Sequence, residues 1–315
     1  MLIPALRHHH QPLLRLLALS VLLSWSFLAR AQDAVSVLKA SVRTEATAAP
    51  VTTDAAVDFT LHRNLIFFEA AVDGRSGNYI LDTGAPTLLL NHRGAAGRPA
   101  TDQEGVGTGG AVALSNRKVS SFVLNGQQLG QRWALALDLR GMERRMGVAI
   151  DGYVGQQLLR NRELRIDFAN RRFELRASVR QPLYEGRPPR QTLRFTYADH
   201  LPVITLRVGN RKLRFALDTG AGVSLLDERF AELAAATGSS MNIQGLDGTA
   251  TDYPLVRIPD LSCWADEAVT VNFTLLDLAH LQAADGAPIA GILGADFLRH
   301  YAVGIDYRRR RVYFW

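Results

Sequence analysis

The chain has 315 residues, of which 47% are hydrophobic and 21% charged, with 26 Gly, 12 Pro and a formal net charge of +6. These values exclude a collagen-like or disordered chain, and the length is enough for one large domain or two modest ones. No basic face with interleaved aromatic residues stands out, so we do not expect nucleic-acid binding. Cys263 is the one cysteine, which excludes an intramolecular disulfide, and we expect it to be a small buried hydrophobic residue.

The first element in the chain is a predicted export signal over 1–31. Basic residues precede a short apolar run over 16–29, which ends in the cleavage motif Ala-Arg-Ala. The run is shorter than the roughly 20 residues that a membrane-spanning helix needs. We therefore expect cleavage before Gln32 and export to the periplasm or the extracellular medium, without stable membrane insertion afterwards. An uncleaved anchor is the alternative.

Composition divides the rest of the chain into four parts. Residues 32–57 are rich in Ala, Thr and Val and form a predicted flexible lead-in, with an inhibitory pro-segment as the alternative. Residues 58–176 and 192–315 are the predicted lobes, and residues 177–191, with three prolines, join them as a linker. We expect each lobe to fold around its own apolar core.

The two predicted lobes repeat one another. Residues 59–91 align with residues 195–227 without a gap at an offset of 136, and both segments contain Leu-Asp-Thr-Gly-Ala. Residues 152–168 align with residues 291–307 at an offset of 139. Two ordered matches at nearly the same offset predict an internal duplication, with the halves related by a pseudo-two-fold axis.

Each half is predicted to be mostly β, with a few short helices. In the first half the expected elements are strands over 64–72 and 79–81 around a turn at Asp73-Gly74, a short helix over 156–161, and a hairpin of 164–168 with 172–175. In the second half they are strands over 201–208 and 215–217 around a turn at Gly209-Asn210, a helix over 227–238, a short helix over 295–300, and a hairpin of 303–307 with 312–315. The segment after Leu89 is expected to be a loop, and Arg308–Arg311 a solvated turn and not a binding patch.

Two Asp-Thr-Gly turns, at Asp82 and Asp218, carry the candidate chemistry. A single copy is typical of an ordinary β-turn, but here two copies follow apolar strands at the same place in a repeat. A pseudo-two-fold axis can bring the two carboxyl groups face to face across one water molecule. Because like charges at that distance cannot both be ionised, the pair holds one proton, and its ionised member can activate the water for attack on an amide.

The halves resemble the pepsin and retroviral protease superfamily, for which a proton shared between two Asp residues is the standard case. The resemblance covers about residues 58–315 and is closest to bacterial retropepsin-like aspartyl proteases, here in a tandem single-chain form. It implies the acid-protease fold of two β-barrel-like lobes, no cofactor and no metal, and it identifies Asp82 and Asp218 as the catalytic dyad. The supporting loop residues that it implies are Thr83, Gly84, Ala85, Thr219, Gly220 and Ala221.

The same resemblance implies further site residues. Two apolar residues followed by Gly155, and two followed by Gly294, match the family's segment behind each active-site loop. The flaps that close over substrate are expected as glycine-rich hairpins over 105–114 and 244–253. The candidate flap glycines are Gly107, Gly109, Gly110, Gly245 and Gly248.

Two features depart from the digestive pepsins. Both loops have alanine after the glycine, at Ala85 and Ala221, so no hydroxyl there can bond the outer carboxylate oxygen. We therefore expect an activity optimum less acidic than that of pepsin. The second departure is Pro86, which is unusual directly after the first motif.

The main prediction is an exported aspartic endopeptidase that acts as a monomer on peptide or protein substrates in an extended conformation. The alternative is a catalytically silent peptide-binding protein of the same fold, against which the two intact Asp residues argue. The aromatic C-terminus does not indicate an outer-membrane barrel, because residues 172–176 occupy the matching place inside the chain. Metal-dependent hydrolysis is not expected, because the histidines lack the spacing of metal ligands.

Overall fold

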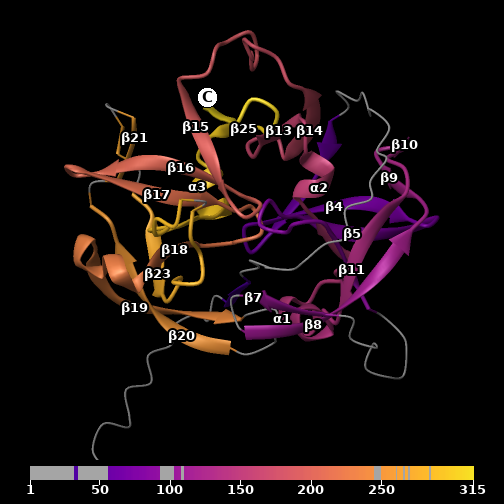
Figure 1. Ribbon diagram of the computed structural model, residues 1–315, viewed down its shortest axis with the longest axis horizontal. Coiled ribbons are helices and arrows are strands. Elements are labelled where there is room, and N and C mark those ends of the chain that lie inside the picture. The colour runs from indigo at the N-terminus through magenta and orange to yellow at the C-terminus, as the bar shows by residue number, and fades with distance from the viewer. Residues whose placement is uncertain are drawn as a thin grey trace, which may run out of the picture. The chain divides into compact units, whose positions relative to one another are not determined.

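The computed structural model describes residues 32–34, 56–92, 103–107, 110–244, 250–259, 261–264, 267–268, 270–283 and 285–315 (Figure 1). Strands account for 55% of the structure and helices for 9%, in two sheets, one of them a curled half-barrel. The predicted fold class, mostly β with two β-barrel-like lobes, is therefore confirmed. None of the described helices is long and apolar enough to cross a membrane. The predicted export signal, residues 35–55, residues 93–102 of the segment predicted as a loop, and the side chain of Cys263 lie outside the described part of the chain.

The first half of the chain builds a sheet of ten strands in the order β10-β9-β4-β5-β12-β6-β11-β8-β7, with β3 beside β4. The elements of this half are β2 (Val57–Asp58), β3 (Thr60–His62), β4 (Leu65–Val72), β5 (Arg75–Leu81), β6 (Leu88–Asn91), β7 (Gln103–Gly107), β8 (Gly110–Val119), β9 (Phe122–Leu124), β10 (Gln127–Gln128), β11 (Arg132–Leu137), α1 (Arg140–Met146), β12 (Gly152–Val154), α2 (Gln156–Leu159), β13 (Arg162–Asp167) and β14 (Arg172–Ala177). The predicted hairpin of β4 and β5 turns at Asp73 and Gly74, whose φ values of 48° and 79° suit a tight two-residue turn.

The second half repeats this plan within a sheet of 16 strands. Its elements are β15 (Gln191–Ala198), β16 (Leu201–Val208), β17 (Arg211–Leu217), β18 (Ser224–Asp227), the 3₁₀ helix η1 (Glu228–Leu233), β19 (Ala235–Gln244), β20 (Ala250–Arg257), β21 (Leu261–Trp264), β22 (Glu267–Ala268), β23 (Asn272–Leu276), β24 (Gly291–Leu293), α3 (Ala295–Leu298), β25 (Ala302–Asp306) and β26 (Arg311–Phe314). Strand β24 runs parallel to β17 in the same way that β12 runs parallel to β5.

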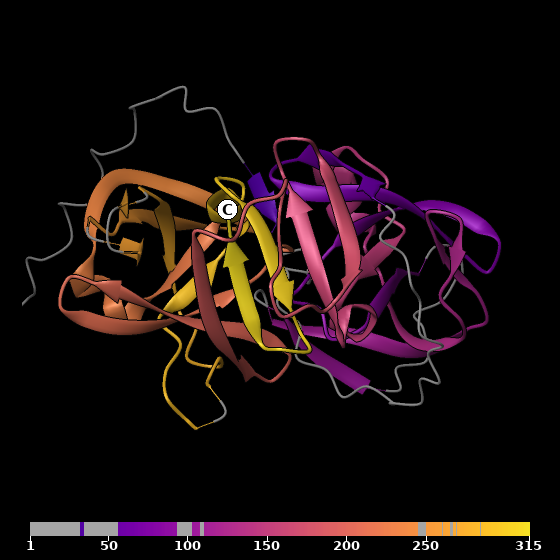
Figure 2. The same cartoon turned by 90° about the horizontal axis from the view of Figure 1, so that it is seen from above.

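The closing hairpins of the two halves meet in the larger sheet. Strand β13 of the first half pairs antiparallel with β25 of the second half, and β14 and β26 lie outside them (Figure 2). The inner faces of these strands bury Leu164 and Ile166 beside Val303 and Ile305, none of which is exposed. Their burial joins the two halves through one continuous apolar cluster, in addition to the separate cluster that each half retains.

Residues 178–190 connect the halves across this shared sheet without a strand of their own, apart from the isolated bridge between Tyr184 and Arg187. The Trp315 ring lies 5.8 Å from the Tyr184 ring, and its indole N–H donates to the Arg187 carbonyl (3.1 Å). These contacts attach the connecting segment to the end of β26. Before the first lobe, β1 (Gln32–Ala34) pairs parallel with the end of β19.

The predicted helix over 227–238 is wrong. A 3₁₀ helix occupies Glu228–Leu233, and strand β19 begins at Ala235. Gly238, expected to end the helix, lies with φ of 76° where the pairing of β19 with β20 shifts register. The alanine-rich pattern favours a helix locally, but pairing with β20 satisfies the backbone of this segment and overrides that preference.

Candidate active site

The two Asp-Thr-Gly turns lie at equivalent places in the two halves. Asp82 follows β5 and Asp218 follows β17, and neither side chain is exposed to solvent. The backbone N–H of Asp82 donates to the Val154 carbonyl (3.0 Å), and that of Asp218 to the Leu293 carbonyl (3.1 Å). Each carboxyl group is thus held at the end of a buried strand by the neighbouring parallel strand.

The threonines of the two turns interlock across the halves. The Thr83 hydroxyl donates to the Leu217 carbonyl (3.1 Å), and the Thr219 hydroxyl donates to the Leu81 carbonyl (2.8 Å). Each hydroxyl oxygen also accepts the backbone N–H of the other threonine at 3.0 Å. Both threonines are fully buried, so these four bonds are made in a medium that strengthens them and makes their loss costly.

The interlocked turns bring the two carboxyl groups together. An added Cβ on Gly84 would lie 2.4 Å from Oδ2 of Asp218, and one on Gly220 would lie 2.4 Å from Oδ1 of Asp82. Glycine is therefore required at both places, because each carboxyl group packs against the opposite turn. Within each turn the glycine N–H donates to the carboxylate of its own Asp, at 2.7 Å for Asp82 and 2.8 Å for Asp218.

Burial and the neighbouring carboxyl group govern the protonation of the pair. Burial raises the pKa of Asp218 well above its ordinary value, and the charge of Asp82 raises it further, against the N–H bonds that lower it. The two side chains are close enough to hydrogen-bond, yet Oδ2 of Asp218 has no donor among the described residues. These observations agree if one carboxyl group carries a proton, because two carboxylates offer only acceptors.

A glycine threads behind each turn. An added Cβ on Gly155 would lie 2.3 Å from the Ala85 carbonyl oxygen, and one on Gly294 would lie 2.6 Å from the Ala221 carbonyl oxygen. The next residue in each case donates its N–H to that same carbonyl (2.8 Å). The backbone of each turn is thus supported from behind by the start of a short helix, α2 or α3.

Two outer contacts were not anticipated from the sequence. At the tip before β4, the Asn64 amide donates to the Gly222 carbonyl (2.9 Å) and accepts from the Arg299 guanidinium (3.0 Å). At the same place in the second half, Nε2 of His200 lies 2.5 Å from the Gly84 carbonyl, which can only accept, so this nitrogen carries the hydrogen. Asn64 and His200 occupy the same position of the repeat, and that alignment was the signal that could have identified them.

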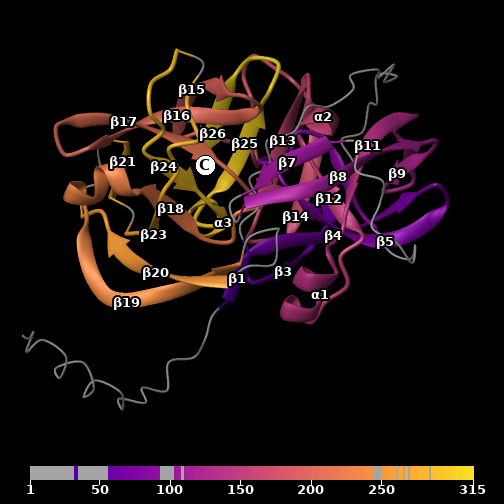
Figure 3. The same ribbon diagram turned by 60° about the horizontal axis from the view of Figure 1, so that its bottom comes forward.

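The flap candidates are partly described. Strands β7 and β8 form an antiparallel hairpin with Gly107 opposite Gly110, within the segment predicted as the first flap (Figure 3). Strands β19 and β20 form the corresponding hairpin in the second half, with Gln244 opposite Ala250. Gly109, Gly245 and Gly248 lie outside the described residues. Both hairpins follow an Asp-Thr-Gly turn in the chain, as a flap would.

The described residues contain no group of three or more His, Cys, Asp or Glu side chains placed to hold a metal ion. Among known proteins, a family model described as "Aspartyl protease" matches residues 204–297, from β16 to the middle of α3. No curated protein matches the chain. The second half of this chain is therefore similar to aspartyl proteases, which supports a pepsin- or retropepsin-like family and a protease-like function.

Proposed function

We propose that the chain is an exported aspartic endopeptidase and that Asp82 and Asp218 are its catalytic dyad. The observation that carries the proposal is the pairing of two fully buried carboxyl groups, one from each half, held by threonines that bond across the halves. A folded protein gains nothing in stability from placing two like charges together in its interior. Such a pair is typical of a site that uses its shared proton.

The two carboxyl groups divide the chemistry between them. The ionised group takes a proton from a water molecule that lies between the pair, and the water oxygen attacks the carbonyl carbon of a peptide bond. The protonated group donates a hydrogen bond to the carbonyl oxygen, where negative charge develops. The raised pKa of Asp218 agrees with one proton held by the pair. The tetrahedral intermediate then collapses: the C–N bond breaks as the proton taken from water passes to the amine nitrogen, the carbonyl re-forms as a carboxylic acid, and the pair returns to its starting state without a covalent enzyme intermediate.

The loops favour a moderately acidic optimum. Ala85 and Ala221 provide no hydroxyl that could donate to a carboxylate oxygen of the pair. The ionised form of the pair therefore lacks the bond that a hydroxyl there would supply, which keeps its proton bound to higher pH. We expect the rate of cleavage to peak well above pH 2, and a peak near pH 2 would contradict this part of the proposal.

A peptide-library digest tests the function directly. The mature chain, beginning at Gln32, is incubated with the library between pH 3 and 7 beside Asp218→Asn and Asp82→Asn, which keep the size of the side chain and remove its charge. Cleavage by the parent and a loss of at least about 1,000-fold in both variants are expected. Equal cleavage by the variants would exclude the dyad. Absence of cleavage by folded parent protein, together with binding of extended peptides, would favour the alternative of a silent peptide-binding protein.

A further inference from the structure

A pocket of about 560 Å³ opens between the two halves, beside the first active-site turn. The first half contributes Pro86, Gln156 and Arg160 to its lining, and the second half contributes His200, Tyr307 and Arg310. Pro86 follows the Asp-Thr-Gly-Ala turn directly, and His200 is the residue that bonds the Gly84 carbonyl. The pocket is therefore continuous with the support of the Asp82 turn, although the proposed reaction does not use it.

The lining of this pocket is strongly basic. Arg160, Arg308 and Arg310 all line it, and its one acidic lining residue is Asp199. Within the described part of the chain, no ion pair joins any of these three arginines to a carboxylate. Arg310 lies instead over the Tyr197 ring, 5.5 Å from its centroid. Three guanidinium groups with no carboxylate partner leave a positive potential that suits an anion.

One residue that lines the same pocket, Tyr307, carries a buried hydroxyl group. Tyr307 is only 4% exposed, and its hydroxyl has no hydrogen-bond partner among the described residues. Burial raises the pKa of Tyr307 well above its ordinary value, so the hydroxyl is a neutral donor. The repeat places Phe168 at the equivalent position of the first half. Phenylalanine could replace Tyr307 without the loss of a hydrogen bond within the protein. Since buried hydroxyl groups normally have a partner, the Tyr307 hydroxyl points to a partner outside the protein chain.

At the equivalent contact, on the other side of the active-site turns, side chains bond across the two halves. There Asn64 bridges the Arg299 guanidinium and the Gly222 carbonyl, at 3.0 and 2.9 Å. Arg299 is the repeat equivalent of Arg160, and it is bonded within the protein. Among the described residues, the pocket beside Pro86 therefore combines arginines without a carboxylate partner with a buried hydroxyl that has no partner, whereas the equivalent arginine at the other contact is bonded.

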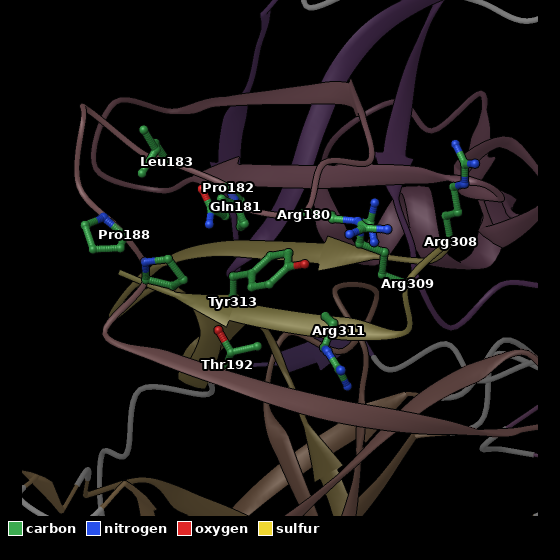
Figure 4. A pocket seen from close by; sticks show the side chains of 11 residues that line it. Arg180, Gln181, Pro182, Leu183, Pro188, Thr192, Arg308, Arg309, Arg311 and Tyr313 are labelled. Carbon is green, nitrogen blue, oxygen red and sulfur yellow. The ribbon is translucent and has the colours of Figure 1, made fainter.

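A second basic pocket provides a useful contrast. It has a volume of about 880 Å³, and its arginines come from both the connecting segment and the β25–β26 turn (Figure 4). Its buried tyrosine, Tyr313, lies 3.5 Å from the Asp306 carboxylate, and Arg309 lies 3.8 Å from the same carboxylate. Tyr313 and Arg309 therefore already share a carboxylate within the protein. In the pocket beside Pro86, the Tyr307 hydroxyl has no such carboxylate partner among the described residues.

We propose that the pocket beside Pro86 binds a small oxyanion, a phosphate or a carboxylate group, which accepts hydrogen bonds from the Tyr307 hydroxyl and from the Arg160 and Arg310 guanidinium groups. Phosphate and carboxylate groups both present several acceptor oxygens, and guanidinium and phenol groups both donate hydrogen bonds. Either anion therefore matches the donors of this pocket. Bound there, the anion joins the two halves and braces the turn that carries Asp82 through Pro86 and His200. The binding itself does not depend on the proposed protease activity.

Calorimetric titration of the mature chain with inorganic phosphate, and separately with citrate, tests the binding. The informative variant is Tyr307→Phe, because the chain itself has Phe at the equivalent position 168. We expect this variant to weaken the tighter of the two anions about tenfold or more, and Arg160→Gln to weaken it likewise. The matched control is Arg299→Gln at the other contact, which should leave anion binding unchanged. Preference for phosphate or for citrate identifies which oxyanion the pocket accepts.

Two outcomes would overturn the proposal. One is the absence of binding of either anion by folded protein at 10 mM, roughly the weak limit of a specific site. The other is equal binding by the parent and Tyr307→Phe with loss in Arg160→Gln, which would indicate adventitious attraction to exposed arginines. Hydrogen exchange gives an independent readout: the peptide that spans residues 81–89 should exchange more slowly with the anion bound, in the parent and not in Tyr307→Phe. Neither readout requires cleavage, so an inactive protein would not obscure the result.

Discussion

The two halves contact one another through symmetric bonds at the active-site turns and through unlike bonds at the outer contacts of Asn64 and His200. At the centre, Thr83 and Thr219 make the same pair of bonds in opposite directions. At the outer contacts, Asn64 bonds Gly222 and Arg299 of the other half, whereas His200 bonds the Gly84 carbonyl beside a pocket. A substitution of one threonine also removes a bond of the other threonine, but an outer contact can change without affecting the equivalent contact of the other half. Duplication therefore keeps the central residues alike and lets the outer contacts diverge.

The largest expected effect concerns the glycines behind the two active-site turns, which both halves share. Gly155→Ala and Gly294→Ala each place a Cβ within 2.3 to 2.6 Å of a backbone carbonyl oxygen. Since backbone must move to relieve that contact, we expect each to lower the free energy of unfolding by about 3 kcal/mol or more. Guanidinium unfolding curves measure the loss. Gly141→Ala in α1 is the control, because a Cβ there meets nothing within 4 Å, and it should raise stability by up to about 1 kcal/mol.

Replacement of Thr83 and Thr219 by valine tests whether the bonds of each threonine depend on the other. Thr83→Val and Thr219→Val each remove one donated and one accepted bond between buried groups, and we expect losses of about 2–3 kcal/mol each. The double variant should lose less than the two single losses together, because each change already weakens the bonds of the other threonine. Thr→Ser at either position keeps the hydroxyl and should retain most of the stability. Strictly additive losses would show that the two turns do not act as a unit.

The stability of Asp218→Asn should depend on pH. The raised pKa of Asp218 means that the folded chain holds a proton that the unfolded chain releases near pH 4. The contribution of this group is therefore fully favourable below about pH 4 and is lost as pH rises through the folded pKa. The variant should match the parent at pH 4 and exceed it by about 1–3 kcal/mol at pH 7. A constant difference across that range would show that charge in the pair does not limit stability.

The smallest expected effect separates the two outer contacts. Asn64→Ala removes two bonds, to Gly222 and Arg299, and should cost about 1–2 kcal/mol. His200→Ala removes the bond to Gly84 and should cost about 1 kcal/mol. A double-variant cycle of Asn64→Ala with Arg299→Gln should give a coupling near 0.5 kcal/mol or more, and none for His200→Ala with Arg299→Gln. Equal costs for Asn64→Ala and His200→Ala would remove the distinction between the outer contacts.

The amino-acid sequence by itself determined the features that depend on local pattern. Alternating apolar residues and the turns at Asp73-Gly74 and Gly209-Asn210 specified the hairpins of both halves. The repeated Leu-Asp-Thr-Gly-Ala and the two motif glycines identified the residues that the structure brings together at the centre. These signals are readable because each one lies within a few residues and occurs twice.

Tertiary structure decided what depends on partners far apart in the chain. Pairing with β20 turned an alanine-rich segment into β19, and pairing of β13 with β25 joined the two halves. The bond of His200 to Gly84 spans 116 residues, and the pocket beside it combines residues from 86 to 310. No local pattern encodes which distant group will satisfy a buried donor, because that depends on how the packed halves meet. The equivalent positions of Asn64 and His200 were visible in the repeat, but only packing gave Asn64 its bonds to Gly222 and Arg299 and placed His200 beside a pocket.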